Sequence, residues 1–248
     1  RKNLYGLNVA SRNWFLTLSA GLKSRGFKPS TIDPCLYIKD DILCLVYVDD
    51  TIFFAQNDEI INDMISDLQT DFDLTDEGDV EAFLGIKFKQ NNHEITMSQP
   101  GLIDSILNDV NMLNQEKVKM HDTPVTAPLL HKHKNGEPRK EDWDYRSIIG
   151  KLSYLCRNTR PDIEFAVHQC ARFKANPMHA HELAIKRICQ YLLKTKHEGI
   201  LMQPNTDLTR LECYVDADFT GAYTPELSHD TSLCRSRTGF VILYSGCP

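Results

Sequence analysis

The sequence predicts an α+β fold in which an opening helix is followed mainly by antiparallel strands, helices dominate the middle and strands return at the end. Apolar runs separated by turn residues recur between residues 35 and 97. Apolar residues at helical spacing then extend from residue 145 to residue 194, and strand-like runs follow from residue 199. With 248 residues and 42% hydrophobic composition, the chain can bury a sizeable core and could hold one or two domains.

An opening helix is predicted up to residue 25, because apolar residues recur there at helical spacing and Gly26 would end it. Its buried face is expected to hold Trp14, Phe15, Leu18 and Leu22. Its exposed face is expected to hold Arg12, Lys23 and Arg25.

Three strands are predicted at 35–38, 42–48 and 51–55. Their residues are apolar on both faces, so we expect each side of the sheet to be covered. Asn57 and Asp58 can cap a following helix. A second hairpin is predicted from strands at 83–89 and 94–97, with Asn91-Asn92 as its turn. Pro100 suits the first turn of the next helix. The inward residues of the two helices are Ile60, Ile61, Met64, Ile65, Leu68, Leu102, Ile103, Ile106, Leu107 and Val110.

Residues 121–142 contain three prolines, a glycine and clustered charges, which predicts a linker or surface loop and places a domain boundary there. The regions before and after it are 1–120, 143–198 and 199–248. Three helices are predicted after the linker, at 145–156, 161–174 and 179–194, and strands at 199–202, 211–215 and 239–244.

The charge distribution says more than the net charge of −6, which argues against indiscriminate nucleic-acid binding. No Lys or Arg occurs between Asp40 and Glu81, whereas basic residues predominate from Asn114 to Lys196. This pattern suits an enzyme that holds cations at its centre and a phosphate backbone alongside. A solvated acidic helix face accounts for the carboxylates between Asp58 and Asp79 equally well.

Other features exclude several classes of protein. The eight cysteines form no C-x-x-C pair and are interpreted as buried thiols. The pairs His131/His133 and His179/His181 lack a partner ligand at metal spacing and are interpreted as surface histidines. With no apolar run of 18 residues and no signal-peptide layout, we expect an intracellular protein cut from a longer one, with no membrane partner.

The segment Tyr47-Val48-Asp49-Asp50 is the part of the sequence that says most about a possible reaction. It joins two apolar strands by a tight turn, which normally needs the positive φ that Gly or Asn adopts, and neither is present. Two adjacent carboxylates also repel one another unless something compensates, such as divalent cations. Asp49 and Asp50 are therefore candidate metal-binding residues, with an ordinary surface turn as the alternative.

A series of motifs, in this order and spacing, resembles the copia-type retrotransposon reverse transcriptase. Before the linker they are Leu4-Tyr5-Gly6-Leu7, Arg12, Trp14, Gly26-Phe27, Asp33, Tyr47-Val48-Asp49-Asp50, Phe83-Leu84-Gly85-Ile86 and Ser98-Gln99. After it they are Gly150-Lys151-Leu152-Ser153-Tyr154-Leu155, Arg160-Pro161-Asp162-Ile163, Ala166-Val167, Lys186-Arg187-Ile188, Tyr191-Leu192, Gly199, Asp216-Ala217-Asp218 and Ser236-Arg237-Thr238-Gly239. The resemblance covers nearly the whole chain.

The resemblance implies a right-hand polymerase fragment. Residues 1–120 would be the palm and the start of the thumb, 143–198 a helical thumb or connection, and 199–248 the first strands of a ribonuclease H-like domain. The implied reaction is RNA-directed DNA synthesis, in which a primer 3′-hydroxyl attacks the α-phosphate of a dNTP on an RNA template. Two magnesium ions, about 4 Å apart, would assist it.

Site residues carry over from the family's motifs. Asp49 and Asp50 would be catalytic and would bind the metal ions, and Tyr47 and Val48 would contact the primer or nucleotide. Leu84 and Gly85 lie in a hairpin that resembles the primer grip. Asp216 resembles the first metal ligand of ribonuclease H.

Departures from the family pattern limit what the isolated chain should do. Val9 stands where the family usually has Gln, and Asn8 and Ser11 also differ. The third polymerase carboxylate would precede Arg1 and the remaining ribonuclease H carboxylates would follow Pro248. We therefore expect weak magnesium binding and no activity without the rest of the polyprotein.

Two other functions are compatible with the sequence. The chain could be a non-catalytic remnant that binds nucleic acid, or a decayed copy of the element. In the first case the phosphate contacts would be Lys151, Arg157, Arg160, Arg172, Lys186 and Arg187. The family's life cycle implies the cytoplasm, inside a virus-like particle, or the nucleus.

Overall fold

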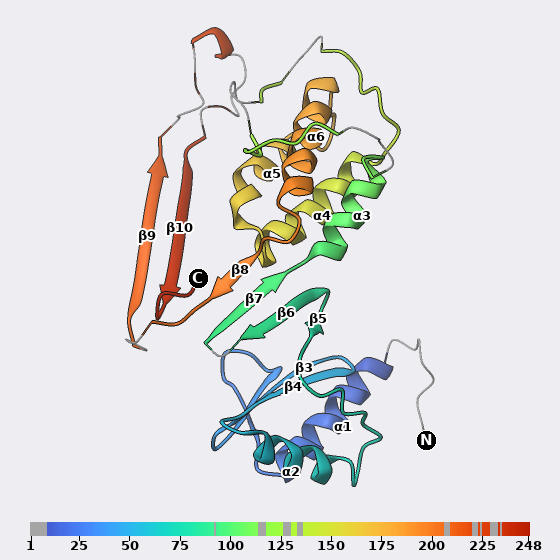
Figure 1. Cartoon of the computed structure of the whole chain (residues 1–248), viewed down its shortest axis with the longest axis vertical. Helices are drawn as coiled ribbons and strands as arrows, with labels where there is room; N and C mark the ends of the chain where they lie inside the picture. Colours follow the sequence, from blue (N-terminus) through green and yellow to red (C-terminus); the bar gives the residue numbers. More distant parts are fainter. Residues whose placement is uncertain are drawn as a thin grey trace. The chain divides into compact units, whose positions relative to one another are not determined.

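The computed structural model of the chain (Figure 1) describes residues 9–91, 93–113, 118–125, 130–132, 136–205, 209–219, 223, 225–228, 233 and 235–248. Within these residues, six α-helices accompany three sheets in which every strand pair is antiparallel, so the predicted mixed α and β composition is confirmed. The chain divides into two compact units, one up to Val80 and one from Glu81. This division differs from the boundary placed at 121–142.

The first unit is a four-stranded sheet with two helices. Its sheet has the order β1-β2-β3-β4, with β1 an additional short strand that the sequence did not predict. The elements are α1 (Ala10–Ser24), β1 (Lys28–Pro29), β2 (Leu36–Lys39), β3 (Ile42–Tyr47), β4 (Asp50–Phe54) and α2 (Asp58–Leu68). The predicted cap of α2 is present, because the Asn57 side chain accepts a hydrogen bond from the Ile60 N–H at 3.0 Å.

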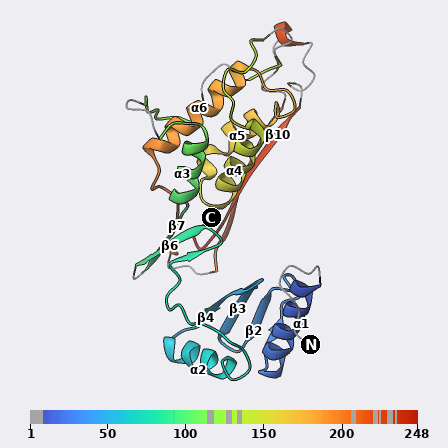
Figure 2. The same ribbon diagram turned by 90° about the vertical axis from the view of Figure 1, so that its right-hand side faces the viewer.

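Both helices cover one face of this sheet (Figure 2). Leu18 and Leu22 of α1 and Met64 and Leu68 of α2 form one core with alternate residues of β3, namely Ile42, Cys44 and Val46. The intervening residues Leu43 and Tyr47, with Phe54 of β4, are 40% to 53% exposed. Ile52, which pairs with Leu45 on the same face, is buried, so the expectation that both faces would be covered is wrong at the exposed residues and not at Ile52. This second face is called the open face below.

Arg25 corrects another expectation, since its side chain is largely buried rather than exposed. Its guanidinium pairs with Asp67 at 2.9 Å and Asp71 at 2.8 Å and also donates to the Asp67 carbonyl, so it fastens the end of α1 to the end of α2. These carboxylates raise the pKa of Arg25. The helical pattern placed Arg25 on the exposed face and could not reveal its partners.

The second unit combines a small sheet, a helical core and a two-stranded ribbon. Residues of its helical core include Ile103, Leu107, Leu152, Ile185 and Ile188, all fully buried. Burying each such side chain stabilises the fold by about 1.5–3 kcal/mol. Its elements are β5 (Ala82–Phe83), β6 (Ile86–Asn91), β7 (Glu94–Ser98), α3 (Pro100–Asp109), α4 (Tyr145–Asn158), η1 (Pro161–Ile163), α5 (Glu164–Ala171), α6 (His179–Lys194), β8 (Ile200–Met202), β9 (Leu211–Asp218), η2 (Pro225–Leu227) and β10 (Arg237–Tyr244).

The sheet of this unit departs from the predictions in two ways. The predicted strand 83–89 is broken by a turn at Leu84-Gly85, so β5 folds back on β6. β8, which had been grouped with the ribonuclease H-like segment, pairs with β7 in the order β5-β6-β7-β8. The junction is tight, because a Cβ on Gly199 would lie 2.0 Å from the Met97 carbonyl oxygen.

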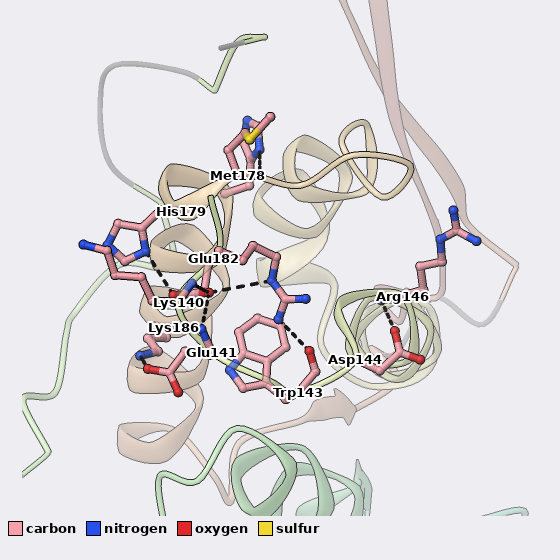
Figure 3. A network of polar contacts seen from close by, with 11 residues as sticks. Lys140, Glu141, Trp143, Asp144, Arg146, Met178, His179, Glu182 and Lys186 are labelled. Atoms are coloured by element: carbon pink, nitrogen blue, oxygen red, sulfur yellow. Dashed lines mark hydrogen bonds and ion pairs between the residues drawn. The ribbon is translucent and has the colours of Figure 1, made fainter. Parts of the chain in front are cut away.

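The polar segment before α4 is held against α6 by a network of contacts (Figure 3). The Glu182 carboxylate of α6 is fully buried and accepts hydrogen bonds from the backbone N–H groups of Lys140, at 3.0 Å, and Glu141, at 3.1 Å. Lys186 of α6 pairs with the Glu141 side chain. The charges that predicted a solvated linker are thus partly used to anchor this segment.

Several side-chain expectations change as well. His181 is buried, stacks on Phe173 with ring centroids 4.0 Å apart and accepts a hydrogen bond from the Met178 N–H, so its assignment as a surface histidine is wrong. Cys44, Cys156, Cys170 and Cys189 are buried thiols as expected, but Cys213 is exposed. Asn92, His133, Cys234 and the motif 4–7 lie outside the described residues. Among the described residues, no helix is both long and apolar enough to span a membrane.

Candidate active site

The Asp49-Asp50 motif lies at the tip of the β3–β4 hairpin. Tyr47 pairs with Asp50, so the loop consists of Val48 and Asp49. Val48 has a φ of +54° and Asp49 does not have a positive φ, which is the φ pattern of a type II′ turn. A β-branched residue in this region is strained by about 1–3 kcal/mol. The positive φ that the sequence required is therefore present, at a residue type that disfavours it.

A hydrogen bond from α1 supports the strained turn. The indole Nε1–H of Trp14 donates to the Val48 carbonyl oxygen at 2.7 Å. The Trp14 ring also packs edge-on against Phe72, with centroids 6.1 Å apart and planes at 88°. The hairpin tip is thereby tied to a helix that is itself anchored in the core of the first unit.

The tip is exposed and carries two kinds of surface. Paired residues of neighbouring strands point to the same face, so Tyr47 and Asp50 continue the open face formed by Leu43 and Phe54. Asp49, in the loop, is also exposed. The motif therefore presents two carboxylates next to an apolar and aromatic surface, an arrangement suited to a cation beside a base or sugar.

Magnesium fits the chemistry of these two carboxylates, but they form only part of a ligand set. Magnesium takes oxygen ligands in octahedral geometry and usually keeps several waters. Among the described residues, no group of three or more His, Cys, Asp or Glu side chains is placed to hold a metal ion. Asp49 and Asp50 can thus supply two oxygens to a site whose other ligands are water, substrate or further protein groups.

Leu84 and Gly85, the predicted primer-binding residues, form a second tight turn, in the second unit. Both have positive φ, of 52° and 76°, as in a type I′ turn. The Tyr154 hydroxyl of α4 donates to the Leu84 carbonyl at 2.8 Å. This turn is therefore also strained at a bulky residue and also held by an aromatic donor from a helix.

Asp216, the predicted ribonuclease H ligand, lies elsewhere. It is exposed on β9 opposite Gly239 of β10, and its neighbour Asp218 lies 3.6 Å from the guanidinium of Arg237. Asp49 and Asp50 belong to the first unit and Asp216 to the second.

Most of the candidate phosphate contacts are engaged within the protein. Arg160 is 1% exposed, pairs with Asp162 at 2.7 Å and donates to Thr195, so it is a core residue and its assignment to a nucleic-acid surface is wrong. Burial alone would raise the pKa of Asp162, but hydrogen bonds from Arg160 and Tyr191 lower it. The other partners are Lys151 with Asp109, Lys186 with Glu141, Arg172 with Gln169, and Arg187 with Thr123.

The sequence did not identify Trp14 and Tyr154 as functional residues. Helical spacing placed Trp14 on the buried face, and Tyr154 was noted only as part of a family motif. Their common signal is a large ring with a polar tip that can donate a hydrogen bond, but Trp14 is only half-buried and Tyr154 is 44% exposed, so burial gave no further sign of a partner. The partner of each is a strained turn 34 or 70 residues away, which no local pattern contains.

Comparison with known proteins supports the resemblance. Residues 1–127 match the family model described as reverse transcriptase (RNA-dependent DNA polymerase). Over 229 residues the chain is 33% identical to the retrovirus-related Pol polyprotein from transposon RE1 of Arabidopsis thaliana, covering 89% of this chain and 15% of that protein. Over 258 residues it is 31% identical to the corresponding polyprotein from transposon TNT 1-94 of Nicotiana tabacum, covering 99% and 18%.

One relative matches this chain over most of its own length. An uncharacterized mitochondrial protein of Arabidopsis thaliana is 31% identical over 206 residues, which cover 82% of this chain and 78% of that protein. No solved structure matches the chain. The chain spans less than a fifth of the length of the two polyproteins. These matches confirm the resemblance: the chain belongs to the reverse transcriptase family, the RNA-directed DNA polymerases of copia-type retrotransposon Pol polyproteins.

Proposed function

We propose that this chain contributes the carboxylates Asp49 and Asp50 to the active centre of an RNA-directed DNA polymerase. The observation that carries the proposal is the β3–β4 hairpin, where two exposed carboxylates follow a strained Val48 that a helix holds in place. A surface turn with no function gains nothing from this strain, whereas functional sites commonly retain it. Membership of the reverse transcriptase family supports the same role.

In this proposal the first unit is the polymerase palm. Asp49 and Asp50 hold two magnesium ions, together with ligands from the rest of the polyprotein. Magnesium held there would lower the pKa of the primer 3′-hydroxyl and would stabilise the charge that develops on the α-phosphate of the dNTP. Tyr47, Val48 and the open face receive the primer end, and Leu84-Gly85 contacts the primer backbone.

In the same proposal, the second unit contacts the nucleic acid beyond the palm. Its helices α3 to α6 act as thumb and connection, and Asp216 on β9 supplies a metal ligand to ribonuclease H. The partners are an RNA template and a DNA primer, and the compartment is a cytoplasmic virus-like particle or the nucleus. Since many of its basic side chains are already paired, binding without turnover is the less favoured function.

Primer extension on an RNA template with magnesium tests the catalytic role. The sequence is expressed within its natural reading frame, as wild type, Asp49→Asn and Asp41→Asn. Asp41 is the matched control, because it lies in the Asp40-Asp41 turn between β2 and β3 of the same sheet. We expect Asp49→Asn to lower extension at least about a hundredfold, since even groups that only support a metal ligand contribute 10- to 100-fold.

The other outcomes are equally informative. Equal extension by wild type and Asp49→Asn would refute the role of Asp49. No extension by any version, with salt-sensitive binding to the RNA–DNA duplex retained, would instead favour the binding-only remnant. A folded protein that neither extends nor binds would favour a decayed copy.

A further inference from the structure

The Val48 carbonyl oxygen is the point at which α1 holds the hairpin tip. It belongs to the peptide group that joins Val48 to Asp49, and this group is planar. Fixing the direction of the carbonyl therefore fixes the Val48–Asp49 peptide plane and the position of the Asp49 Cα. Because Trp14 Nε1 lies 2.7 Å from this oxygen, Trp14 can control where the Asp49 carboxylate points without touching it.

Trp14 is itself well supported. It shares a helix face with Leu18 and Leu22, which are buried in the core of the first unit. Its ring packs against Phe72, and Gly21 of α1 leaves the space for Phe72, since a Cβ on Gly21 would lie 2.5 Å from the end of that ring. A donor supported in this way can hold a strained turn in one conformation.

The chemistry of the donor is specific. An indole offers one N–H and no acceptor, so it can only donate. Phenylalanine would fill most of the same space and contact Phe72 but would leave the Val48 carbonyl without this donor. The hydrogen bond and the packing of Trp14 can therefore be separated by one substitution.

We infer that Trp14 is a positioning residue for Asp49: its Nε1–H holds the Val48–Asp49 peptide in the strained conformation from which Asp49 reaches the metal site. The inference rests on the proposed function, because it concerns the same carboxylate. It adds that Trp14, on α1, controls the turnover rate. Trp14 needs no contact with the substrate to do so.

The test compares Trp14→Phe with Phe72→Leu in the primer-extension assay, using the natural reading frame. Phe72→Leu removes the ring that supports Trp14 but leaves the indole donor, so it is the control for lost packing. We expect Trp14→Phe to lower kcat about 10- to 100-fold, as displacements near 1 Å do, and to leave the KM for dNTP close to wild type. Phe72→Leu should lower the thermal midpoint with a much smaller effect on kcat.

A second substitution tests the mechanism. Glycine adopts positive φ without a steric cost and is the usual residue at the first central position of a type II′ turn, so Val48→Gly relieves the strain that Trp14 is inferred to hold. The loss of kcat caused by Trp14→Phe should therefore be smaller in the Val48→Gly background than in wild type. A merely structural role of Trp14 predicts the same loss in both backgrounds, and that result would overturn the inference.

Asp49→Asn, assayed in parallel, separates the two proposals. If Asp49→Asn retains wild-type extension, the proposed function fails and Trp14 has no carboxylate to position. If Asp49→Asn is inactive while Trp14→Phe keeps the wild-type kcat, the catalytic role stands and the role of Trp14 is refuted.

Discussion

Glu182 shows how a fully buried carboxylate can stay ionised in this protein. Burial alone would raise its pKa, but the backbone N–H groups of Glu141 and Lys140 and the His179 side chain lower it below the ordinary value. The Arg139 guanidinium adds a longer contact, at 3.7 Å, and itself stacks over Trp143. The negative charge therefore connects α6 to the segment that precedes α4.

Replacing this carboxylate should make the second unit less stable in a pH-dependent way. Because the folded-state pKa of Glu182 is lowered, its contribution is complete above the ordinary pKa of 4.5 and is lost as pH falls through the folded-state value. Glu182→Gln should therefore reduce the free energy of unfolding by roughly 1.5–3 kcal/mol at neutral pH, as for hydrogen bonds to charged groups. The difference from wild type should shrink at acidic pH.

The measurement is urea unfolding at several pH values, followed by Trp143 fluorescence in a Trp14→Phe background, since the chain has only two tryptophans. Glu137→Gln is the control, because Glu137 lies in the same segment but its side chain is exposed and paired only with Lys140 at 2.9 Å in the contacts described. Equal losses for both variants at all pH values would contradict the role of Glu182.

At the scale of single residues, the sequence predicted the chemical types but not the partners. Asp49, Asp50 and the need for a positive φ near them follow from local rules for tight turns. Arg25, Arg160 and His181 were assigned to the surface because charged and imidazole side chains usually lie there. Their burial depends on carboxylates, carbonyls and rings that other segments of the chain supply, which the sequence does not place.

Among the secondary-structure elements, β8 depends most on one residue. Gly199 precedes it, and any Cβ there would overlap the Met97 carbonyl of β7. Gly199→Ala should force β8 away from β7 and destabilise the second unit by roughly 1–3 kcal/mol, the usual range for overpacking. Hydrogen exchange of the Ile200–Met202 amides should become faster, and the thermal midpoint should fall.

Gly150→Ala is the matched control for this prediction. Gly150 lies within α4, and a Cβ there would meet nothing within 4 Å. Alanine is favoured over glycine in a helix by up to about 1 kcal/mol, so this variant should be as stable as wild type or more stable. A Gly199→Ala variant that behaved in the same way would show that the junction can relax.

Whether a segment forms a helix or a strand was largely predictable, because the spacing of apolar residues within a short stretch of sequence indicates it. The helices α1 to α6 match the predicted helices to within a few residues, and β3, β4, β7 and β10 match predicted strands. The pairing of β8 with β7 joins segments about a hundred residues apart, which no local period contains. The break at Leu84-Gly85 was missed because leucine in a strand-like run rarely adopts positive φ.

The whole molecule carries an unusual apolar surface on the β9–β10 ribbon. Val215 and Phe240 are paired across the two strands and are 67% and 69% exposed, and their neighbours Tyr214 and Val241 are also exposed. Exposed apolar strands favour association with other chains. The isolated chain should therefore self-associate through this ribbon.

A charged pair placed on the ribbon should reduce that association. Val215→Lys combined with Phe240→Glu puts opposite charges at directly opposed positions, so the pairing of the strands is retained. Light scattering at increasing concentration should be lower than for wild type. Leu183→Lys on α6 is the control, because it removes a single exposed apolar side chain from another surface and should change little.

The sequence predicted the family but not the division of the molecule into units. Family motifs are short runs of residues, so they and their order can be recognised directly in the sequence. The polar stretch 121–142 resembled a boundary, yet part of it is bound to Glu182 and Lys186 of α6. The compact units divide instead at Val80 and Glu81, at the end of the stretch that lacks Lys and Arg.

The length of the open face has a consequence for footprinting. Along β3 it extends from Leu43 to Tyr47, which is four residue steps, or about 13 Å at the usual rise of a strand. A nucleic-acid strand advances by about 3.4 Å per nucleotide, so a primer lying along β3 would be shielded over roughly four nucleotides from its end. Chemical probing of a bound primer should therefore show that replacing Leu43 and Tyr47 changes protection only within the first few nucleotides from the primer end, while protection farther along the duplex is unchanged.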